Sequence, residues 1–491
     1  MRNTKRSRRN GLNRSQARRA DSPQTITFLG AAGNVSGSRF LVETPGMKLL
    51  VDCGLYQERR FARRNWDPFP IPPDTIDAVI LTHAHLDHCG YLPKLVADGF
   101  NGNIYCTAAT ADLVKIILQD SGHIQEEDAR KKKRRHEREG RKGRYPEVPL
   151  YDAEQARAVF QFLTPVAYYE RFDLPDGATA VLRDAGHILG ASIVELTAGS
   201  KGDKRTILFS GDLGRWNRPL VRDPDLVHHA DYVVVESTYG DRDHPDNSVG
   251  ELEAQLADVI NSTMELGGNI IIPSFAVERA QELLYHLKRL MDDHKIPKIP
   301  VFLDSPMAQS VTRVFASHSK ILDNKIERSF RAGDSPLDFE ELVMVQSVDQ
   351  SKSLNSLNEP TIIIAGAGMC NGGRIKHHLV NNIGRRENTV LFVGYQAEGT
   401  LGRQIVIGQN PVRIFGQIWD VRARIVQIES FSAHADRLDL ERWLGALEAP
   451  PRTVFVVHGE SEASEIYSTE MSAKTGWKFE VPKYRDWYPL G

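Results

Sequence analysis

The sequence has few cysteines and no long apolar run, and both absences narrow the class of protein. Only four of its 491 residues are cysteines, and no two of them form a Cys-x-x-Cys pair. A disulfide framework is therefore not expected, and this usage fits a reducing cytoplasm. No stretch approaches the roughly 18 consecutive apolar residues of a membrane helix. Residues 1–20 lack the apolar region of a secretory signal. We therefore expect a cytoplasmic protein without a membrane partner.

Two common signatures of catalysis are also missing. The sequence contains no Gly-x-Ser-x-Gly nucleophile elbow and no Walker-A phosphate loop. A serine hydrolase of that type and a P-loop nucleotide hydrolase are therefore not expected. Hydrolytic chemistry in this chain has to come from other side chains, and its histidines and carboxylates are the candidates.

The length and the pattern of the chain indicate two domains. A chain of 491 residues is too long for one ordinary hydrophobic core. Short apolar strands separated by glycines fill the first part. From about Asp241 strands alternate with helices, which indicates a parallel sheet. Near the C-terminus, apolar strands are again followed by histidines, as in the first part. We expect an α/β protein with a basic tail at 1–22, a first domain at 23–240 completed by 431–491, and a second domain inserted at 241–430.

The net charge of −2 conceals two basic segments. Residues 1–20 carry eight Lys or Arg and no acid, and removing these eight from 62 leaves 54 basic residues against 64 acidic ones. Residues 130–144 add ten basic residues against two acids, in a polar, helix-prone stretch (120–144) that follows a helix expected at 109–118. Such segments on an acidic body can attract a phosphate backbone. The alternative is a disordered tail and a solvated helix.

The most informative segment is His83-Ala84-His85-Leu86-Asp87-His88, directly after the apolar run at 78–81. Three imidazoles and a carboxylate at the end of a buried strand are donors that zinc accepts, with bonds of roughly 2.0–2.2 Å. Two neighbouring pairs of donors indicate two ions, about 3.5–4 Å apart as in two-metal hydrolases.

Other strand ends supply further candidate ligands. His187 follows an apolar strand at 178–182, and Asp212 follows another at 206–209. We expect His83, His85 and His187 to hold a first zinc ion, and Asp87, His88 and one further histidine to hold a second. A carboxylate has two oxygens to offer, so Asp212 can bridge both ions. Asp52 is expected behind the ligands, where it accepts the second N–H of an imidazole.

Two zinc ions can activate water without a serine or cysteine nucleophile. They lower the pKa of a shared water to near neutrality and neutralise charge that develops on a substrate oxygen. Metal-activated water is therefore the expected mechanism.

The order of these motifs resembles that of the metallo-β-lactamase superfamily. The residues that carry this resemblance are Asp52, His83-x-His85-x-Asp87-His88, His187 and Asp212. Later blocks resemble the β-CASP branch, which contains pre-mRNA 3′-end-processing endonucleases, ribonuclease J and the DNA-repair nuclease Artemis. These blocks are Glu-Ser-Thr-Tyr-Gly at 236–240, Phe-Ser-Ala-His at 431–434, Val-His-Gly-Glu at 457–460, and the segments at 273–276 and 394–401.

The resemblance implies a four-layer αβ/βα metallo-β-lactamase domain, with an inserted parallel-sheet β-CASP domain over its zinc cleft. It also implies that His458 supplies the missing ligand of the second zinc. His434 would protonate the leaving 3′ oxygen, and Glu236 would orient the imidazole of His434. Bond cleavage needs such an acid opposite the attacking hydroxide. The expected catalytic residues are Asp87, Glu236 and His434.

The sequence departs from the family pattern at two positions. Ala367 stands where relatives often carry a serine that helps to hold a substrate phosphate, and Glu278 stands where glycine is common. Both changes concern the binding of phosphate and not the zinc chemistry. The candidate substrate-binding residues are Arg279, His378 and Arg403; for His378 a position on a helix surface is the alternative.

The resemblance favours a zinc-dependent ribonuclease that cuts single-stranded RNA as an endonuclease and leaves 5′-phosphate ends. A histidine at position 458 is typical of the RNA-acting members. One alternative is a small-molecule hydrolase acting on thioesters or lactams, although a small substrate needs no large inserted domain. Another is a non-catalytic subunit of an RNA-processing complex, although no expected ligand is missing. A homodimer and a processing-complex partner are both left open.

Overall fold

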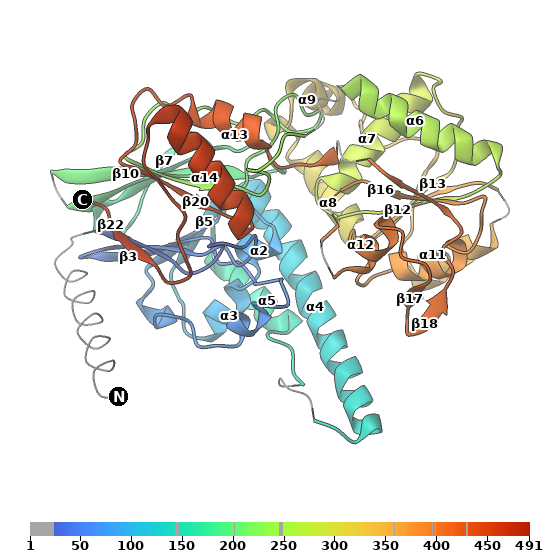
Figure 1. The fold of residues 1–491 in the computed structure, drawn as a ribbon, viewed down its shortest axis with the longest axis horizontal. Helices are drawn as coiled ribbons and strands as arrows, with labels where there is room; N and C mark the ends of the chain where they lie inside the picture. Colours follow the sequence, from blue (N-terminus) through green and yellow to red (C-terminus); the bar gives the residue numbers. More distant parts are fainter. Residues whose placement is uncertain are drawn as a thin grey trace. The chain divides into compact units, whose positions relative to one another are not determined.

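The computed structural model in Figure 1 divides the chain into two compact units. It describes residues 24–142, 147–200, 202–244, 249–357, 359–394, 396–397, 399–428 and 431–491. Within these residues, unit 1 comprises 24–216, Asp223–Asp243 and His434–Gly491, and unit 2 comprises Asn217–Arg222 and His244–Ala433. The basic tail expected at 1–22, and Arg144 in the second basic segment, lie outside the described residues.

Unit 1 contains two seven-stranded sheets. The spatial order of the first is β22 (Trp487–Pro489), β1 (Thr25–Phe28), β2 (Phe40–Thr44), β3 (Met47–Val51), β4 (Ala78–Ile80), β5 (Asn103–Thr107) and β6 (Leu163–Val166). The order of the second is β21 (Phe479–Glu480), β20 (Thr453–Val457), β11 (Tyr232–Glu236), β10 (Asp203–Phe209), β9 (Ser192–Ser200), β8 (Thr179–Asp184) and β7 (Arg171–Asp173).

The hydrophobic core of unit 1 lies between these two sheets. Phe28 of β1 contacts Phe455 of β20, with ring centroids 5.1 Å apart, and Phe40 of β2 stacks on Phe209 of β10 at 6.1 Å. Burial of each such side chain stabilises the fold by about 1.5–3 kcal/mol. Buried and half-buried residues alternate along β8, because only one face of this strand points into the core.

Helices cover the outer faces of the two sheets (Figure 1). Helix α4 contacts β5 and β6 of the first sheet, and α14 contacts β20 and β21 of the second. The helices of unit 1 are α2 (Leu86–Cys89), α3 (Leu92–Ala97), α4 (Ala108–Glu139), α5 (Ala153–Ala158), α13 (Arg437–Leu444) and α14 (Ser461–Thr475), with short 3-10 helices η1 (Ala62–Asn65), η2 (Pro73–Thr75), η3 (Val159–Phe162) and η4 (Pro175–Gly177). The predicted four-layer αβ/βα arrangement is therefore confirmed.

Helix α4 is a single helix of 32 residues. It joins the helix expected at 109–118 to the helix-prone stretch expected at 120–144, and no proline interrupts the segment. Its one internal glycine, Gly122, lies so close to the backbone of Ala153 that a Cβ would approach within 2.8 Å. The side chain of Thr107 accepts a hydrogen bond from the Thr110 N–H at the start, and Gly140 ends the helix with a φ of 63°.

Unit 2 is built on a six-stranded sheet whose paired strands are all parallel. Its order is β14 (Leu342–Met344), β13 (Val301–Asp304), β15 (Ile362–Ala365), β12 (Ile270–Pro273), β16 (Thr389–Phe392) and β19 (Arg424–Gln427), and β17 (Val412–Ile414) pairs with β18 (Gln417–Trp419) separately. The central strands are completely buried runs rich in isoleucine, as expected for a sheet covered on both faces. The predicted parallel-sheet domain is therefore confirmed.

The strands of unit 2 alternate with helices along the chain. They are α6 (Val249–Glu265), α7 (Arg279–Asp292), α8 (Pro306–Ser317), α9 (Asn324–Arg331), α10 (Val348–Ser353), α11 (Ile375–Asn382) and α12 (Leu401–Val406), with 3-10 helices η5 (Ser319–Ile321) and η6 (Leu354–Ser356). The short segment Asn217–Arg222 also belongs to this unit, because Val221 bridges to Leu322 and Arg218 forms an ion pair with Glu282. In the part of the chain described here, no helix combines the length and apolar character that crossing a membrane requires.

Candidate metal centre

Strand ends of unit 1 bring the candidate ligands together. The segment from His83 to His88 follows β4 and enters α2. In the second sheet, Asp212 follows β10, Glu236 ends β11, and His458 follows β20. Because β10, β11 and β20 pair in parallel, their carboxyl ends lie at the same edge of the sheet. This shared edge explains how residues 212, 236 and 458 come to lie side by side.

A first group of donors consists of His83, His85, His187 and Asp212. The Nδ1 atom of His85 lies 3.1 Å from Nε2 of His83 and 3.3 Å from Nε2 of His187. Oδ2 of Asp212 lies 3.4 Å from Nε2 of His83 and 3.6 Å from Nε2 of His187. Around a tetrahedral zinc ion with bonds of about 2.0–2.1 Å, neighbouring donors would lie about 3.3–3.4 Å apart. The spacing of this group therefore fits one metal ion.

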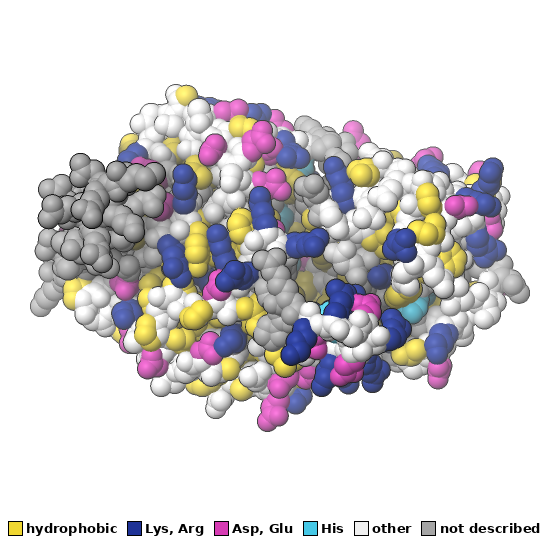
Figure 2. Space-filling model, turned by 60° about the horizontal axis from the view of Figure 1, so that its bottom comes forward, with side chains coloured by type: hydrophobic (Ala, Val, Ile, Leu, Met, Phe, Trp, Pro, Cys, Tyr) yellow, Lys and Arg dark blue, Asp and Glu magenta, His cyan; other side chains and the backbone are white. Residues whose placement is uncertain are grey.

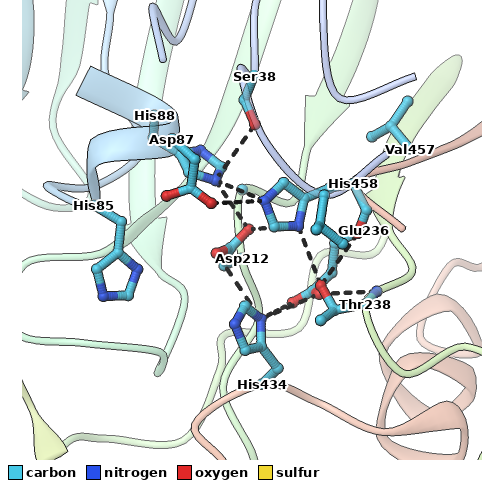
Figure 3. Close-up of polar contacts among 12 residues, drawn as sticks. Ser38, His85, Asp87, His88, Asp212, Glu236, Thr238, His434, Val457 and His458 are labelled. Atoms are coloured by element: carbon cyan, nitrogen blue, oxygen red, sulfur yellow. Dashed lines mark hydrogen bonds and ion pairs between the residues drawn. The ribbon is translucent and has the colours of Figure 1, made fainter. Parts of the chain in front are cut away.

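A second group consists of Asp87, His88 and His458, and Asp212 lies beside it (Figure 3). Nε2 of His458 lies 3.1 Å from Nε2 of His88 and 3.5 Å from Oδ2 of Asp87. Oδ1 of Asp212 lies 3.3 Å from Nε2 of His88. This buried oxygen accepts no hydrogen bond from any residue that the structure describes. Asp212 therefore turns one oxygen toward each group, which fits a carboxylate that bridges two metal ions.

Burial favours the neutral form of the three histidines in the first group. It lowers the pKa of His83 to about 3 and that of His85 to about 4, and it also lowers the pKa of His187. These imidazoles are therefore neutral at physiological pH, and neutral imidazole is the form that binds metal. Burial alone would raise the pKa of Asp212, but the imidazoles around it, His458 foremost, hold that pKa well below its usual range. Asp212 is accordingly a carboxylate.

Asp52 lies behind the second group, where the sequence analysis expected it. Its Oδ2 lies 2.8 Å from Nδ1 of His88, so that Nε2 of His88 is left to face Asp212 and His458. Asp52 is completely buried and has a φ of 60°, a backbone conformation that an L-residue rarely adopts. Its Oδ1 accepts the N–H of Thr82, which fixes the carboxylate between β3 and β4. The hydrogen bond to His88 fixes the orientation of the imidazole.

His434 lies at the edge of this cluster and contacts Glu236 (Figure 3). Nδ1 of His434 lies 3.3 Å from Oε2 of Glu236 and 3.8 Å from Oδ2 of Asp212. Burial would lower the pKa of His434, but the charge of Glu236 raises that pKa to about 9. The backbone N–H of Leu213 donates to Oε1 of Glu236 at 2.6 Å and holds the carboxylate in place. His434 keeps 23% of its side chain exposed, whereas that of His83 is completely buried.

Three hydroxyl groups at this centre were not predicted from the sequence. Oγ1 of Thr82 lies 2.8 Å from Asp52 Oδ2 and 3.0 Å from Nδ1 of His83. Oγ1 of Thr238 lies 3.1 Å from Nδ1 of His458, and Oγ of Ser38 lies 3.4 Å from Nε2 of His88. In the sequence, Thr82 is a polar residue between an apolar strand and the histidine cluster, and Thr238 lies in the Glu-Ser-Thr-Tyr-Gly block at 236–240.

The three candidate substrate-binding residues belong to unit 2 and are not part of the donor cluster. Arg279 is buried and pairs with Glu282 at 2.5 Å. His378 is also buried, with Nε2 2.6 Å from Oδ2 of Asp304, so it does not lie on a helix surface. Arg403 is exposed on α12 and forms no ion pair with any described residue. Their contact with substrate stays a prediction.

One of the two departures from the family pattern has a structural correlate. Glu278 has a φ of 64°, a conformation that favours glycine, which accounts for glycine being common at this position. The second departure, Ala367, lies just after β15, and its carbonyl accepts a hydrogen bond from the N–H of Cys370. Nothing in the structure explains the alanine at this position.

Three family models match the sequence. They are the metallo-beta-lactamase superfamily over residues 32–153, the Beta-Casp domain over 280–405, and a Zn-dependent metallo-hydrolase RNA specificity domain over 419–482. The first match covers His83 to His88, and the last covers His434 and His458.

Characterised relatives match nearly the whole chain. Ribonuclease TTHA0252 of Thermus thermophilus is 37% identical over 438 residues, which are 89% of this chain and 93% of that protein. The transcription termination factor FttA of Methanocaldococcus jannaschii is 30% identical over 89% of this chain and 67% of its own length. FttA of Pyrococcus abyssi is 31% identical over 94% of this chain and 70% of its own length.

A solved structure has a similar fold. It is the crystal structure of a protein of unknown function from Enterococcus faecalis V583, with a TM-score of 0.53 and 12% sequence identity. The match covers 95% of this chain and 99% of that one. At this identity the match concerns the fold alone.

Proposed function

Because the chain belongs to the β-CASP branch of the metallo-β-lactamase superfamily, we propose that it is a zinc-dependent ribonuclease. Its proposed substrate is single-stranded RNA, cleaved internally to leave 5′-phosphate ends. The observation that carries the proposal is the carboxylate of Asp212, which turns one oxygen to each of two donor groups. A relative named ribonuclease and the RNA specificity domain support RNA as the substrate.

We assign two zinc ions to the two donor groups. Their proposed ligands are His83, His85 and His187 for the first and Asp87, His88 and His458 for the second, with Asp212 shared. Two ions held there would activate a water molecule and offset negative charge on a substrate phosphate. Manganese could replace zinc where oxygen donors dominate. All these ligands come from one chain, so both ions can be held without a residue from a second copy.

His434 is the proposed general acid. Glu236 keeps the imidazole of His434 protonated and oriented, because its carboxylate contacts Nδ1 and leaves Nε2 for the substrate. A protonated imidazole can donate a proton to the 3′ oxygen as the P–O bond breaks. Asp87 is proposed to act as ligand and to position the water, since Oδ2 lies 3.5 Å from His458 Nε2 and the side chain is partly exposed.

The domain assignment is part of the same proposal. Unit 1 corresponds to the metallo-β-lactamase domain expected at 23–240 and 431–491, and unit 2 corresponds to the β-CASP domain expected at 241–430. We place the protein in the cytoplasm, in keeping with four free, buried cysteines.

Incubation with a single-stranded RNA labelled at either end tests the proposed function. We expect fragments with internal 5′-phosphate ends from the metal-loaded protein, and no cleavage after treatment with a chelator. Added zinc should restore the activity. Elemental analysis of the same preparation should give about two zinc ions per chain, in line with the two donor groups.

Three other outcomes would each contradict a different part of the proposal. Mononucleotides released from the 5′ end would indicate an exonuclease in place of an endonuclease. Two bound zinc ions without any RNA cleavage, but with turnover of a thioester or lactam, would indicate the small-molecule hydrolase. RNA binding without bound metal would indicate a non-catalytic subunit.

Replacement of His458 by alanine should remove the second metal ion selectively. His458 contacts His88 and Asp87 and lies apart from His83 and His85. We therefore expect about one zinc ion per chain in place of two, measured by elemental analysis, and a loss of cleavage. Retention of two tightly bound ions would contradict the assignment of His458 as a ligand.

A further inference from the structure

The second half of α4 carries positive charge that neither the core nor the metal centre uses. Residues of α4 up to Gly122 pack into unit 1, and beyond that point only His136 is buried. In Figure 1 this half of the helix extends past α3 and α5. The exposed cations on it and just after it are Arg130, Lys131, Lys133, Arg134, Arg135, Arg138, Arg141 and Lys142.

Most of these cations have no acidic partner within the part of the chain that the structure describes. Lys131 pairs with Glu127 and Arg141 pairs with Glu139. No described carboxylate pairs with the others, and residues 130, 134 and 138 follow one another at intervals of four along one face of the helix. Like charges at this spacing repel one another and destabilise a helix. A polyanion along this face would relieve the repulsion.

An apolar groove lies beside the basic half of α4. It has a volume of about 240 Å³ and lies between η1, α4 and the segment at 148–150. Trp66 and Val148 line it and are partly exposed, at 37% and 56%, and Lys132 and Asp128 of α4 form its polar side. Arg59, Arg60 and Arg63 are exposed on the same segment as Trp66. Figure 2, in which the lower side of Figure 1 comes forward, shows basic and hydrophobic side chains intermingled at the surface.

We propose that this surface, formed by the end of α4 and the Trp66 groove, is a second RNA-binding site of unit 1. The α4 cations would contact phosphates, and Trp66 would stack on a base. Single-stranded nucleic acid is bound by this combination, a positive track with an aromatic side chain beside it. A protein partner would call for a larger apolar area, whereas the cations here outnumber the apolar residues. The proposal rests on the proposed function, because it takes RNA as the ligand.

The surface is remote from the metal centre. The hydroxyl of Thr110, in the first turn of α4, donates to the carbonyl of Gly190, in the loop that carries His187. Residue 134 is 24 positions further along the helix, or about 36 Å at 1.5 Å per residue. A stacked strand advances about 3.4 Å per nucleotide, so an RNA of roughly ten nucleotides is needed to reach from one site to the other. The second site should therefore affect long RNA and not short RNA.

Binding of a 40-residue oligouridylate in the presence of a chelator tests the charged part of this surface. The logarithm of the binding constant falls as the logarithm of the salt concentration rises, and each phosphate contact on a single strand makes this slope steeper by about 0.7. We expect the slope of the double variant Arg134→Gln, Arg138→Gln to be shallower than that of the wild type by about 1.4. The matched control Arg171→Gln, Lys204→Gln removes two exposed cations from strands β7 and β10 and should leave the slope unchanged.

Substitution of Trp66 tests the groove. Trp66→Ala should weaken binding of the 40-mer about tenfold, in the range measured for loss of one stacked base. Trp66→Phe keeps an aromatic ring and should restore most of the affinity. Thermal unfolding of each variant distinguishes a loss of stacking from a loss of fold.

The outcomes separate this inference from the proposed function. If the α4 double variant changes the salt slope as expected but the 40-mer is never cleaved in the presence of zinc, the proposed ribonuclease function is refuted and the second RNA-binding site is supported. If the 40-mer is cleaved but its salt slope is the same in wild type, double variant and control, the second site is refuted. A tetranucleotide is too short to contact both sites. An α4 variant that slows cleavage of a tetranucleotide as much as cleavage of the 40-mer would therefore also refute the second site.

Discussion

Replacement of His434 by alanine is expected to lower the rate of RNA cleavage by about 10²–10⁴-fold while the protein keeps both metal ions. This range is typical for removal of a general acid. His434 contacts Glu236 at 3.3 Å, whereas the first donor group is complete without it. The rate should fall most for an unactivated 3′ oxygen leaving group, because such a group depends on protonation. Single-turnover cleavage and elemental analysis of the same preparation measure the two quantities.

Two further variants sharpen the assignment of His434. Glu236→Gln keeps the shape of the side chain but removes the charge that raises the pKa of His434. We expect it to lower the rate less than His434→Ala does, because the imidazole itself is retained. His228→Ala removes an exposed histidine that contacts the carbonyl of Ala446 in the same unit, and it should leave the rate unchanged. Loss of zinc from His434→Ala would mean that His434 is a ligand, and the assigned role would then be wrong.

The location of the donor cluster could be predicted from the sequence because strand ends determine it. Each candidate ligand lies a few residues after an apolar run, and in the structure these runs are β4 of the first sheet and β8, β10 and β20 of the second. His187, Asp212 and His458 are separated by many residues in the chain, yet the structure brings all three beside the segment from His83 to His88. The change from strand pairs to alternating strands and helices also predicted the parallel sheet of unit 2.

The features that the sequence did not reveal depend on tertiary contacts. Thr238 reaches His458 only because β11 and β20 pair in register. Gly122 of α4 packs closely against Ala153, a contact between segments that a local pattern does not contain. The burial of Arg279 and His378 follows from acids at positions 282 and 304, which pair with them inside unit 2. For Thr238, Gly122 and His378 the missing information is the identity of a neighbour that is distant in the sequence.

Replacement of Asp212 by asparagine should have the largest effect of any single substitution at this centre. Its two oxygens lie 3.3–3.6 Å from donors of both groups, among them His83 Nε2 and His88 Nε2. Asparagine has nearly the same shape but no negative charge, and its nitrogen cannot serve as a donor to a metal. We therefore expect the protein to bind fewer than two zinc ions per chain. Loss of several kcal/mol of charge stabilisation corresponds to a rate at least about 10³-fold lower.

The effect on metal binding can be measured without any RNA. A ligand that binds only the folded state raises its stability in proportion to the logarithm of the ligand concentration. Zinc should therefore raise the melting temperature of the wild type more than that of Asp212→Asn. Asp231→Asn is the matched control: it changes an acid that precedes β11, at the opposite end of the strand from Glu236, where it accepts the N–H of Thr206. That control should keep both the zinc-dependent shift and the activity. An Asp212→Asn protein that still gains stability from two equivalents of zinc would show that the two donor groups bind metal without a bridging carboxylate.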